Sequence, residues 1–294
     1  MLHSIVIPHR SRNRVLNQCL LSIDGSRAHS GCDDYEVIVV DDSDQVPILP
    51  DVPNVSILSL MPPPDGVFNK PRLLNHGIGA SNGDLLTFLD ADMLVGRDWL
   101  SAAPSRLGRR CEVDLNGEPP LTCLFYRVRH LMVTEVRERN QDIVLHALEA
   151  CSTTRENFFA RYDEFTKAFE ARGCPWCSKP RHQEPLFGNS QLSIRRDMLA
   201  DLRFNEDFSG YGFEDLWFIR ELWWRRGQRY RAEICTAPNE SLLHILHESK
   251  MSPKGPWYNS ALNTRNQHLW QRDKRFRYSK GQIFRAECAK EQRR

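Results

Sequence analysis

Short apolar runs alternate with amphipathic segments over the first hundred residues. The runs that we expect to form strands are 4–8, 35–40, 55–60 and 84–89. Between them, apolar residues recur at helical spacing over two segments, 14–23 and 72–80. Repeated strand–helix–strand units with apolar strands are typical of a mostly parallel sheet that is covered by helices. The pattern therefore predicts the α/β fold class.

The rest of the chain is less regular. A largely helical pattern covers 136–171. It is followed by a short strand at 191–194, an aromatic-rich helix over 215–226 that stops at Gly227, and a strand at 230–235.

Charge is nearly balanced over the whole chain but not along it. The 294 residues carry 40 Lys and Arg against 38 Asp and Glu, a net charge of +2, which argues against a dedicated nucleic-acid binder. Residues 271–294 hold nine Lys and Arg against three Asp and Glu, a net charge of +6. We expect this basic tail either to form a solvated surface helix or to contact an anionic membrane surface or partner.

Neither the cysteines nor the apolar runs indicate export. Nine cysteines, an odd number, are scattered over the chain, which favours reduced thiols over a disulfide framework. No run approaches the roughly 18 apolar residues of a membrane span, and residues 1–8 enter a strand-like run without a secretory signal. We expect a cytoplasmic protein, with peripheral contact at the inner membrane face as a role for the basic tail.

Two acidic clusters come directly after expected strands. Asp41-Asp42-Ser43 follows the second strand, and Asp90-Ala91-Asp92 follows the fourth. Ligands bind beyond the carboxyl ends of the strands in such sheets, so both clusters lie where a site is expected. The carboxylates of Asp90 and Asp92 suit Mg²⁺ or Mn²⁺, which would neutralise a diphosphate. Asp42 either caps or turns the chain or accepts a hydrogen bond from a nucleobase or ribose.

Two later segments hold further candidates. A turn with two glycines precedes Glu214 and Asp215, which open a helix. There the two acids serve as partners of the helix dipole or, at a pocket, one of them serves as a general base. His244 and His247 share a helix face or lie on opposite faces of a strand, so their spacing alone leaves their role open.

Five short blocks carry a family resemblance. They are Ile5-Val-Ile-Pro-His-Arg-Ser-Arg-Asn-Arg14, Phe68-Asn-Lys-Pro-Arg-Leu-Leu-Asn75, Asp90-Ala-Asp92, Gly210-Tyr-Gly-Phe-Glu-Asp215 and His247-Glu-Ser-Lys250. In this order they resemble the inverting nucleotide-sugar glycosyltransferases of the GT-A fold, specifically the β-1,4-galactosyltransferase-like and chondroitin-polymerase-type group (families 2 and 7). The second block is the most specific, being similar to the Phe-Asn-Arg-Ala-Lys-Leu-Leu-Asn of that group.

The resemblance implies a binding site for a UDP-sugar donor. Pro8, Arg10 and Asp42 would line the nucleotide, with Asp42 at the base or ribose. Lys70 and Arg72 would contact the donor phosphates or order their loop.

The resemblance also implies a metal and a catalytic base. Asp92 and His247 would ligate Mn²⁺ or Mg²⁺, and Asp90 would lie nearby, at the sugar or behind the ligands. Asp215 would take the proton of the acceptor hydroxyl, and Glu214 would help to hold the acceptor or the donor sugar.

The chain departs from the group's pattern at three places. Tyr211 replaces a Trp, so we expect the acceptor platform to differ, and Phe213 replaces a Gly, which reshapes the donor pocket. Leu216 and Trp217 replace the final acidic residues of the segment. The stretch from Asp92 to Gly210 is also longer than the group needs, which indicates an inserted helical lid.

We expect one catalytic domain with four parts. They are a nucleotide-sugar-binding half, a helical insertion, an acceptor and catalytic half and a basic tail, with the bounds 1–104, 105–186, 187–256 and 257–294. Within the insertion, Cys174 and Cys177 could bind zinc with Cys151 or His182, but one Cys-x-x-Cys is insufficient for a closed site, and free thiols at a helix end are the alternative.

The expected function is metal-dependent, inverting transfer of a hexose or N-acetylhexosamine from a UDP-sugar to a hydroxyl of a glycan or lipid-linked glycan. One alternative is a family-2-type transferase that uses UDP-glucose or UDP-N-acetylglucosamine in cell-surface glycan synthesis. A nucleotidyltransferase is disfavoured because the loop after the first strand lacks glycines, which also argues against dinucleotide oxidoreductases and P-loop kinases. A non-catalytic sugar-binding module of the same fold is the remaining alternative.

Overall fold

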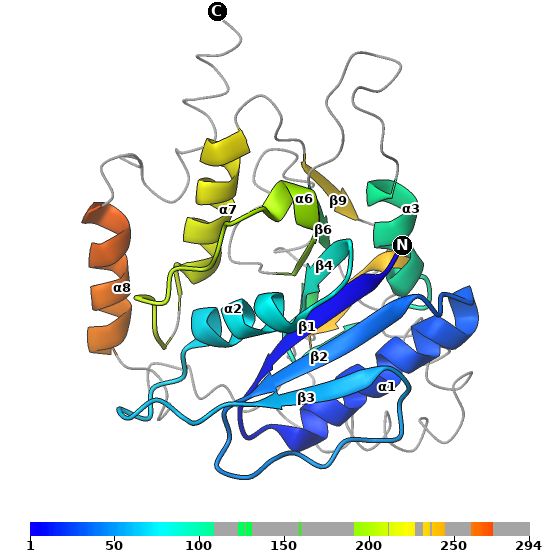
Figure 1. The fold of residues 1–294 in the computed structure, drawn as a ribbon, viewed down its shortest axis with the longest axis horizontal. Helices are drawn as coiled ribbons and strands as arrows, with labels where there is room; N and C mark the ends of the chain where they lie inside the picture. Colours follow the sequence, from blue (N-terminus) through cyan, green and yellow to red (C-terminus); the bar gives the residue numbers. More distant parts are fainter. Residues whose placement is uncertain are drawn as a thin grey trace, which may run out of the picture.

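A seven-stranded sheet runs through the computed structural model of this chain (Figure 1). The structure describes residues 1–108, 123–126, 128–130, 159, 191–210, 212–226, 232–235, 237–244 and 260–272. In spatial order the strands are β3 (Val55–Ser59), β2 (Tyr35–Asp41), β1 (His3–His9), β4 (Leu85–Phe88), β8 (Leu192–Arg195), β6 (Cys123–Tyr126) and β9 (Ala232–Cys235).

Most neighbouring strands in this sheet are parallel. β3, β2, β1 and β4 pair parallel with one another, and β6 pairs parallel with β9. β8 is reversed, because it lies antiparallel between β4 and β6. The predicted α/β fold with a mostly parallel central sheet and flanking helices is therefore confirmed.

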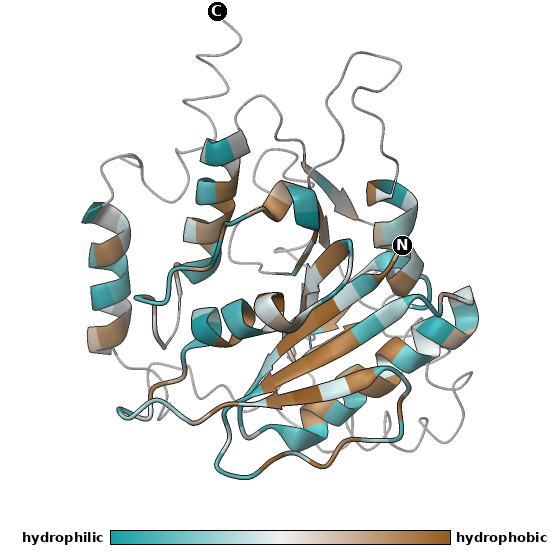
Figure 2. Ribbon diagram, viewed as in Figure 1, coloured by the Kyte–Doolittle hydropathy of each residue, from teal (hydrophilic) through white to brown (hydrophobic). Residues whose placement is uncertain are grey.

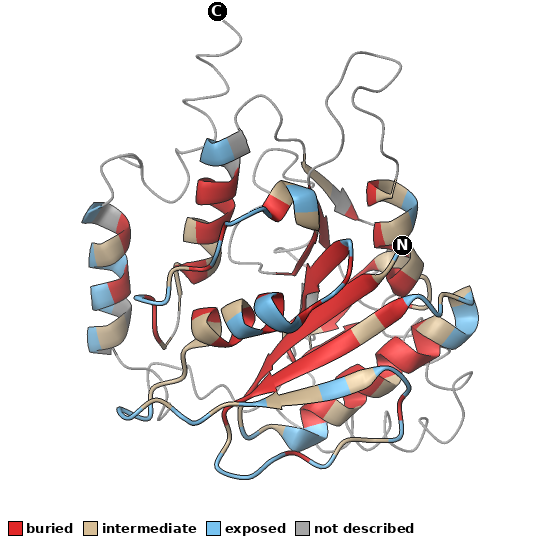
Figure 3. Cartoon of the chain, in the orientation of Figure 1, coloured by how far each residue is buried: buried red, intermediate tan, exposed pale blue. Residues whose placement is uncertain are grey.

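Helices cover both faces of the sheet, which explains why its central strands are largely apolar on both faces. The four helices are α1 (Asn13–Ser30), α2 (Lys70–Ala80), α3 (Trp99–Leu107) and α7 (Glu214–Arg226). α1 and α3 pack on the face to which Ile5 and Ile7 point, and α2 and α7 pack on the face of Val6 and Phe88. Figures 2 and 3 show β1, β2 and β4 as largely apolar and buried, the edge strand β3 as more exposed, and the polar, exposed helix faces turned outward.

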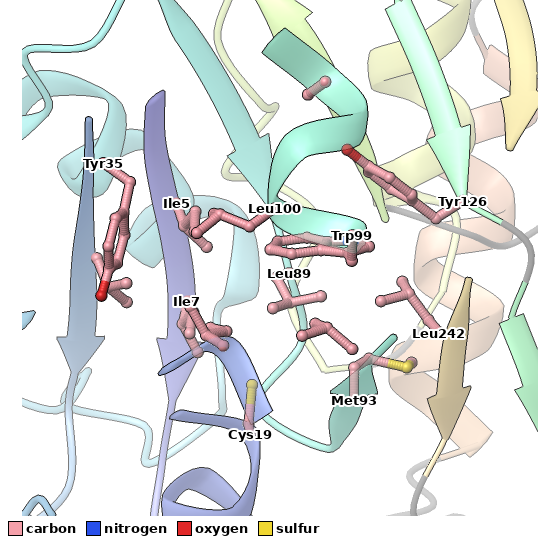
Figure 4. Packing of buried hydrophobic residues seen from close by; sticks show 14 of the residues in the cluster. Ile5, Ile7, Cys19, Tyr35, Leu89, Met93, Trp99, Leu100, Tyr126 and Leu242 are labelled. Carbon is pink, nitrogen blue, oxygen red and sulfur yellow. The ribbon is translucent and has the colours of Figure 1, made fainter. Parts of the chain in front are cut away.

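Trp99 is central to the cluster on the α1 and α3 face (Figure 4). Its side chain is fully buried, and its ring centroid lies 5.4 Å from that of Tyr126 in β6. Leu89, which follows β4, and Leu242 belong to the same cluster. α3 thus joins the parallel strands to the segments that come later in the chain.

A second, three-stranded sheet lies beyond the end of β4. Its order is β5 (Met93–Val95), β10 (Leu242–His244) and β7 (Val128–His130). β5 pairs antiparallel with β10, and in this register His244 lies opposite Met93. The sequence pattern did not predict these strands, because three residues are too few to show a period. Their pairing matters for the site, since it brings His244 next to the residue before Met93.

The remaining described elements are α6 (Arg196–Leu199), the 3₁₀ helix η2 (Pro238–Glu240) and α8 (Ser260–Arg272). α1 continues beyond the predicted 14–23 to Ser30, and α8 forms at the start of the segment expected as a tail. No helix in the described ranges is long and apolar enough to span a membrane. Apart from Phe159, the predicted helical pattern over 136–171 lies outside the described residues, as do the Cys174–Cys177 motif and most of the basic tail. The four-part division stays a prediction.

Candidate active site

The loop between β1 and α1 is held by a buried pair of side chains. His9 donates from Nδ1 to Asp41 Oδ1 at 2.7 Å, and its Nε2 accepts the backbone N–H of Arg12 at 3.1 Å. α1 has no side-chain cap of its own, so His9 satisfies one of the free amides at its start. Asp41 Oδ2 is buried without a hydrogen-bond partner among the described residues. Sequence reasoning gave His9 no role and named Asp41 only as part of the acidic cluster after the second strand.

Asp42 and Arg10 form the second contact at this end of the sheet. Arg10 Nε donates to Asp42 Oδ1 at 2.7 Å, and a second guanidinium nitrogen donates to Oδ2. The same guanidinium donates to the carbonyl of Gly66 at 2.8 Å and lies over the ring of Phe68, 5.4 Å from its centroid. Pro8 lies buried in β1, two residues before Arg10. The structure thus brings the three predicted nucleotide residues together, with Asp42 orienting Arg10.

Asp90 is fixed by contacts to both of its carboxylate oxygens. Lys70 Nζ lies 2.7 Å from Oδ1, and the amide of Gln191 donates to Oδ2 at 2.6 Å. Gln191 also accepts the backbone N–H of Asp90 at 2.8 Å. These contacts favour a place behind the metal ligands for Asp90, one of the two roles that we expected for it. Gln191 carried no signal in the sequence beyond its position at the start of a short strand.

Lys70 connects this cluster to the acidic pair of α7. Its Nζ lies 3.8 Å from Asp215 Oδ1, and the side chains of both residues are only 12% exposed. Burial opposes the charged form of Lys70. The carboxylates of Asp215, Asp90 and Glu214 outweigh this effect and raise the pKa of Lys70 above its usual value. Lys70 is therefore a fixed cation between three carboxyl groups.

Arg72, the other basic residue of this block, points elsewhere. Its guanidinium donates to the carbonyl of Met61 at 3.0 Å, and its backbone N–H donates to Asn69 Oδ1, the N-cap of α2, at 2.9 Å. We expected Arg72 either to contact the donor phosphates or to order their loop. These contacts favour the second role, because they tie Arg72 to the loop before α2.

The two acids that open α7 differ in their surroundings. Glu214 is buried, and burial raises its pKa to about 8; the adjacent Asp215 carboxylate adds to the increase, and Lys70 opposes it. Glu214 therefore holds a proton at neutral pH and can donate a hydrogen bond. Asp215 carries the ion pair with Lys70. When the surroundings make the pKa values of two neighbouring carboxyl groups differ in this way, one group can serve as an acid and the other as a base.

One carboxylate oxygen of Asp92 lies close to both a histidine and an arginine. Its Oδ2 lies 3.5 Å from His244 Nε2 and 3.1 Å from Arg12 Nη1. Burial lowers the pKa of His244, but the hydrogen bond to Asp92 and the charges of Asp92 and Asp90 outweigh this and raise it. His247, the predicted metal ligand, lies outside the described residues. Sequence reasoning noted His244 but gave it no role.

These groups fit a divalent cation. Asp92 offers a carboxylate oxygen and His244 a ring nitrogen, and both converge on one point beside the parallel strands. No cluster of three or more acidic, His or Cys side chains suited to a metal occurs in the described part of the chain. Mg²⁺ is usually held by one or two carboxylates together with substrate phosphates and water, so two protein donors are enough for that type of site.

The turn before α7 keeps a backbone conformation that favours glycine. Gly210 and Gly212 have φ of 75° and 96°, and Phe213 has φ of 75°. The backbone N–H of Gly210 donates to the carbonyl of Phe68 at 2.8 Å, which ties the turn to the loop before α2. We predicted that Phe213 reshapes the donor pocket; the structure shows that it also adopts a strained backbone.

Comparison with known families supports the class of protein. Residues 4–113 match the model described as "Glycosyl transferase family 2". This region holds the donor-side residues from Pro8 to Asp92, and the match agrees with the expectation of a glycosyltransferase. Comparison with curated proteins finds no match.

Several solved structures resemble this chain at low sequence identity. The crystal structure of S. aureus TarS has a TM-score of 0.51 and 14% identity, over 84% of this chain and 37% of that one. S. aureus TarS 1–349 in complex with UDP has a TM-score of 0.50 and 14% identity, over 84% and 61%. The mannosyltransferase PcManGT from Pyrobaculum calidifontis, with GDP-Man and Mn²⁺, has a TM-score of 0.48 and 16% identity, over 84% and 57%.

The chain thus spans less than two thirds of each of these proteins. At such identities the likeness to TarS shows the fold, which is the GT-A fold expected from the sequence.

Proposed function

We propose that this chain is a metal-dependent, inverting glycosyltransferase that moves a hexose or N-acetylhexosamine from a UDP-sugar to an acceptor hydroxyl. The observation that carries the proposal is the position of Lys70, which contacts Asp90 at 2.7 Å and Asp215 at 3.8 Å. Three blocks that the sequence keeps far apart meet there in one buried group of opposite charges. A structural role alone gives no reason for a largely buried cation to pair with two carboxylates at the carboxyl ends of the strands.

Asp215 is the base in this proposal. It takes the proton from the acceptor hydroxyl while the hydroxyl oxygen bonds to the anomeric carbon and the bond from that carbon to the UDP oxygen breaks. The attack comes from the face opposite the leaving group, so an α-linked donor gives a β-linked product. Glu214, with its raised pKa, keeps its proton and donates a hydrogen bond to the acceptor or donor sugar.

Asp92 and His244 would hold Mn²⁺ or Mg²⁺, and His247 stays a predicted ligand. When bound, such a cation supplies positive charge to the diphosphate leaving group. Lys70 and Arg12 add fixed positive charge at the same place, since each already contacts an acid of the Asp-Ala-Asp segment. Arg10 and Asp42, with Asp41 behind them, would receive the nucleotide.

The match to family 2 favours the family-2-type alternative over the β-1,4-galactosyltransferase-like grouping. UDP as the nucleotide is supported by the resemblance and by TarS 1–349, a structure of this fold that contains UDP. A glycan or lipid-linked glycan is the proposed acceptor. The proposed location is the cytoplasm, with the basic tail at the inner membrane face.

A screen of nucleotide-sugars tests the proposal. We expect one UDP-sugar to raise the melting temperature of the protein when Mn²⁺ is present and to have little effect without it. The same donor should release UDP when it is incubated with the protein. A non-catalytic sugar-binding module would release none. If no nucleotide-sugar shifts the melting temperature or releases nucleotide, the proposal fails.

A further inference from the structure

The turn that leads into α7 is strained at a large side chain. Phe213 has φ of 75°, a conformation that costs little for glycine and is unfavourable for a bulky residue. Its carbonyl accepts the backbone N–H of Trp217 at 2.9 Å, a bond of the first turn of α7. The conformation of Phe213 therefore sets the direction in which Glu214 and Asp215 leave the turn.

α8 contacts this turn at two positions, Ser209 and Gly212. Asn266 is fully buried, and its side-chain amide donates to the carbonyl of Ser209 at 2.9 Å and to that of Gly212 at 3.3 Å. A Cβ on Gly210 would lie 3.2 Å from Leu262 Cδ1, so the helix packs closely against the turn. Two carbonyls of the turn thus share one donor group from a helix that follows much later in the chain.

Aromatic and charged side chains lock the same helix to α7, its neighbour in Figure 1. The ring of Phe213 lies 6.0 Å from that of Trp270, and the guanidinium of Arg220 stacks over Trp270 at 3.5 Å. Arg220 and Trp270 are both buried. Phe213 is held at its side chain by Trp270, while Asn266 holds the backbone next to it.

We propose that α8 is a clamp that holds the strained turn in place and thereby positions the catalytic base, with Asn266 as the positioning residue. The inference rests on the proposed function, because it assigns α8 to the site in which Asp215 acts. With glycine at position 213, as in the family pattern, the backbone would keep this conformation at little cost. With Phe213 the turn needs an external constraint, and α8 supplies it.

A double-mutant cycle tests the clamp. The variants are Asn266→Leu, which removes the donor at similar volume, Phe213→Gly, which removes the strain, and their combination. Gln267→Leu is the matched control, because Gln267 is an exposed amide on the same helix. We expect Asn266→Leu to lower kcat about 100-fold with the donor KM within about twofold, the pattern of a misplaced catalytic group. In the Phe213→Gly background, the same substitution should cost less than about fivefold.

An equal loss of kcat in both backgrounds would overturn the inference, because α8 would then not oppose the strain. So would a comparable loss in Gln267→Leu. Hydrogen exchange at the amides of Gly210 and Trp217 separates this inference from the proposed function. Asn266→Leu should speed exchange at both amides, and much less so in the Phe213→Gly background. If the wild-type protein transfers no sugar but exchange behaves in this way, the proposed function fails and the clamp stands; unchanged exchange in Asn266→Leu refutes the clamp.

Discussion

The donor end of the sheet and the turn before α7 hold their charged groups by different means. At the donor end, Asp42 pairs with Arg10 and Asp41 with His9, across two strands that lie side by side in register. At the turn, Asp215 depends on a lysine from α2 and on a strained backbone that contacts α8. The first arrangement follows from strand pairing, which a rigid, buried sheet maintains. The second depends on a few long-range contacts, so single substitutions there should have the larger effects.

Removal of Lys70 should have the largest effect on stability. Lys70→Met leaves the carboxylates of Asp90 and Asp215 without their cation, and breaking a largely buried pair in this way costs up to about 3–5 kcal/mol. Arg72→Met, on the same helix, removes a side chain that donates to the carbonyl of Met61 and should cost about 1 kcal/mol. Urea unfolding at pH 7 compares the two. Equal losses would show that the Lys70 contacts do not hold the site together.

Removal of His244 should weaken the metal-dependent binding of UDP. We expect His244→Ala to lower the UDP affinity measured with Mn²⁺ by at least about tenfold, while the weaker affinity without Mn²⁺ changes little. Asp92→Ala should abolish the metal-dependent part. His268→Ala, at an exposed position of α8, is the control for loss of an imidazole. Calorimetry that shows full metal dependence in His244→Ala would remove His244 from the metal site.

Replacement of Glu214 should change the pH dependence of stability. The folded protein keeps the Glu214 proton up to a pKa of about 8, well above the ordinary value of 4.5, whereas the unfolded chain releases it. The unfolded state thus binds fewer protons in this window, and the stability that Glu214 contributes falls as the pH rises from 4.5 to 8. Glu214→Gln should remove this fall, so the variant gains on the wild type by up to about 1.4 kcal/mol per pH unit.

Unfolding by urea at several values between pH 5 and pH 8 measures this difference. Parallel curves for the two proteins would mean that Glu214 is ionised in the folded state, and the division of roles between Glu214 and Asp215 would be lost.

Removal of Arg12 should have the smallest effect, and an opposite sign. Arg12 contacts the oxygen of Asp92 that a metal would use, and its side chain is 35% exposed. Without a nucleotide, Arg12→Met should therefore strengthen Mn²⁺ binding, because it removes a competing cation. The gain should be only about threefold, because solvent screens the charge of Arg12. Arg14→Met, at an exposed position, is the control. Weaker Mn²⁺ binding in Arg12→Met, measured by electron paramagnetic resonance, would contradict the competition.

The comparison also separates what the sequence could predict from what it could not. The donor side was predictable because each acid follows an apolar strand, and parallel strands end at one edge of the sheet. The block from Phe68 to Asn75 was informative for a different reason. Asn69 caps α2, and the start of this helix fixes Lys70 at the site.

The other contacts depend on pairing between segments that no local pattern connects. β5 and β10 are three residues each, too short to show a period, so the meeting of Asp92 with His244 carried no sequence signal. Gln191 reaches Asp90 only because β8 pairs antiparallel with β4. The replacement of a glycine by Phe213 was visible, but its strained backbone and its contact with α8 follow from tertiary packing alone.

Asp215→Asn tests the central claim most directly. Turnover of the UDP-sugar that raises the melting temperature should fall by about 10²–10⁴-fold in this variant, because an amide cannot take the proton from the hydroxyl of the acceptor. UDP affinity in the presence of Mn²⁺, measured on the same preparation, should stay within about twofold of the wild type, since the base contributes to transfer rather than to donor binding. Near-normal turnover in Asp215→Asn would contradict the assignment of the base and, with it, the proposed mechanism.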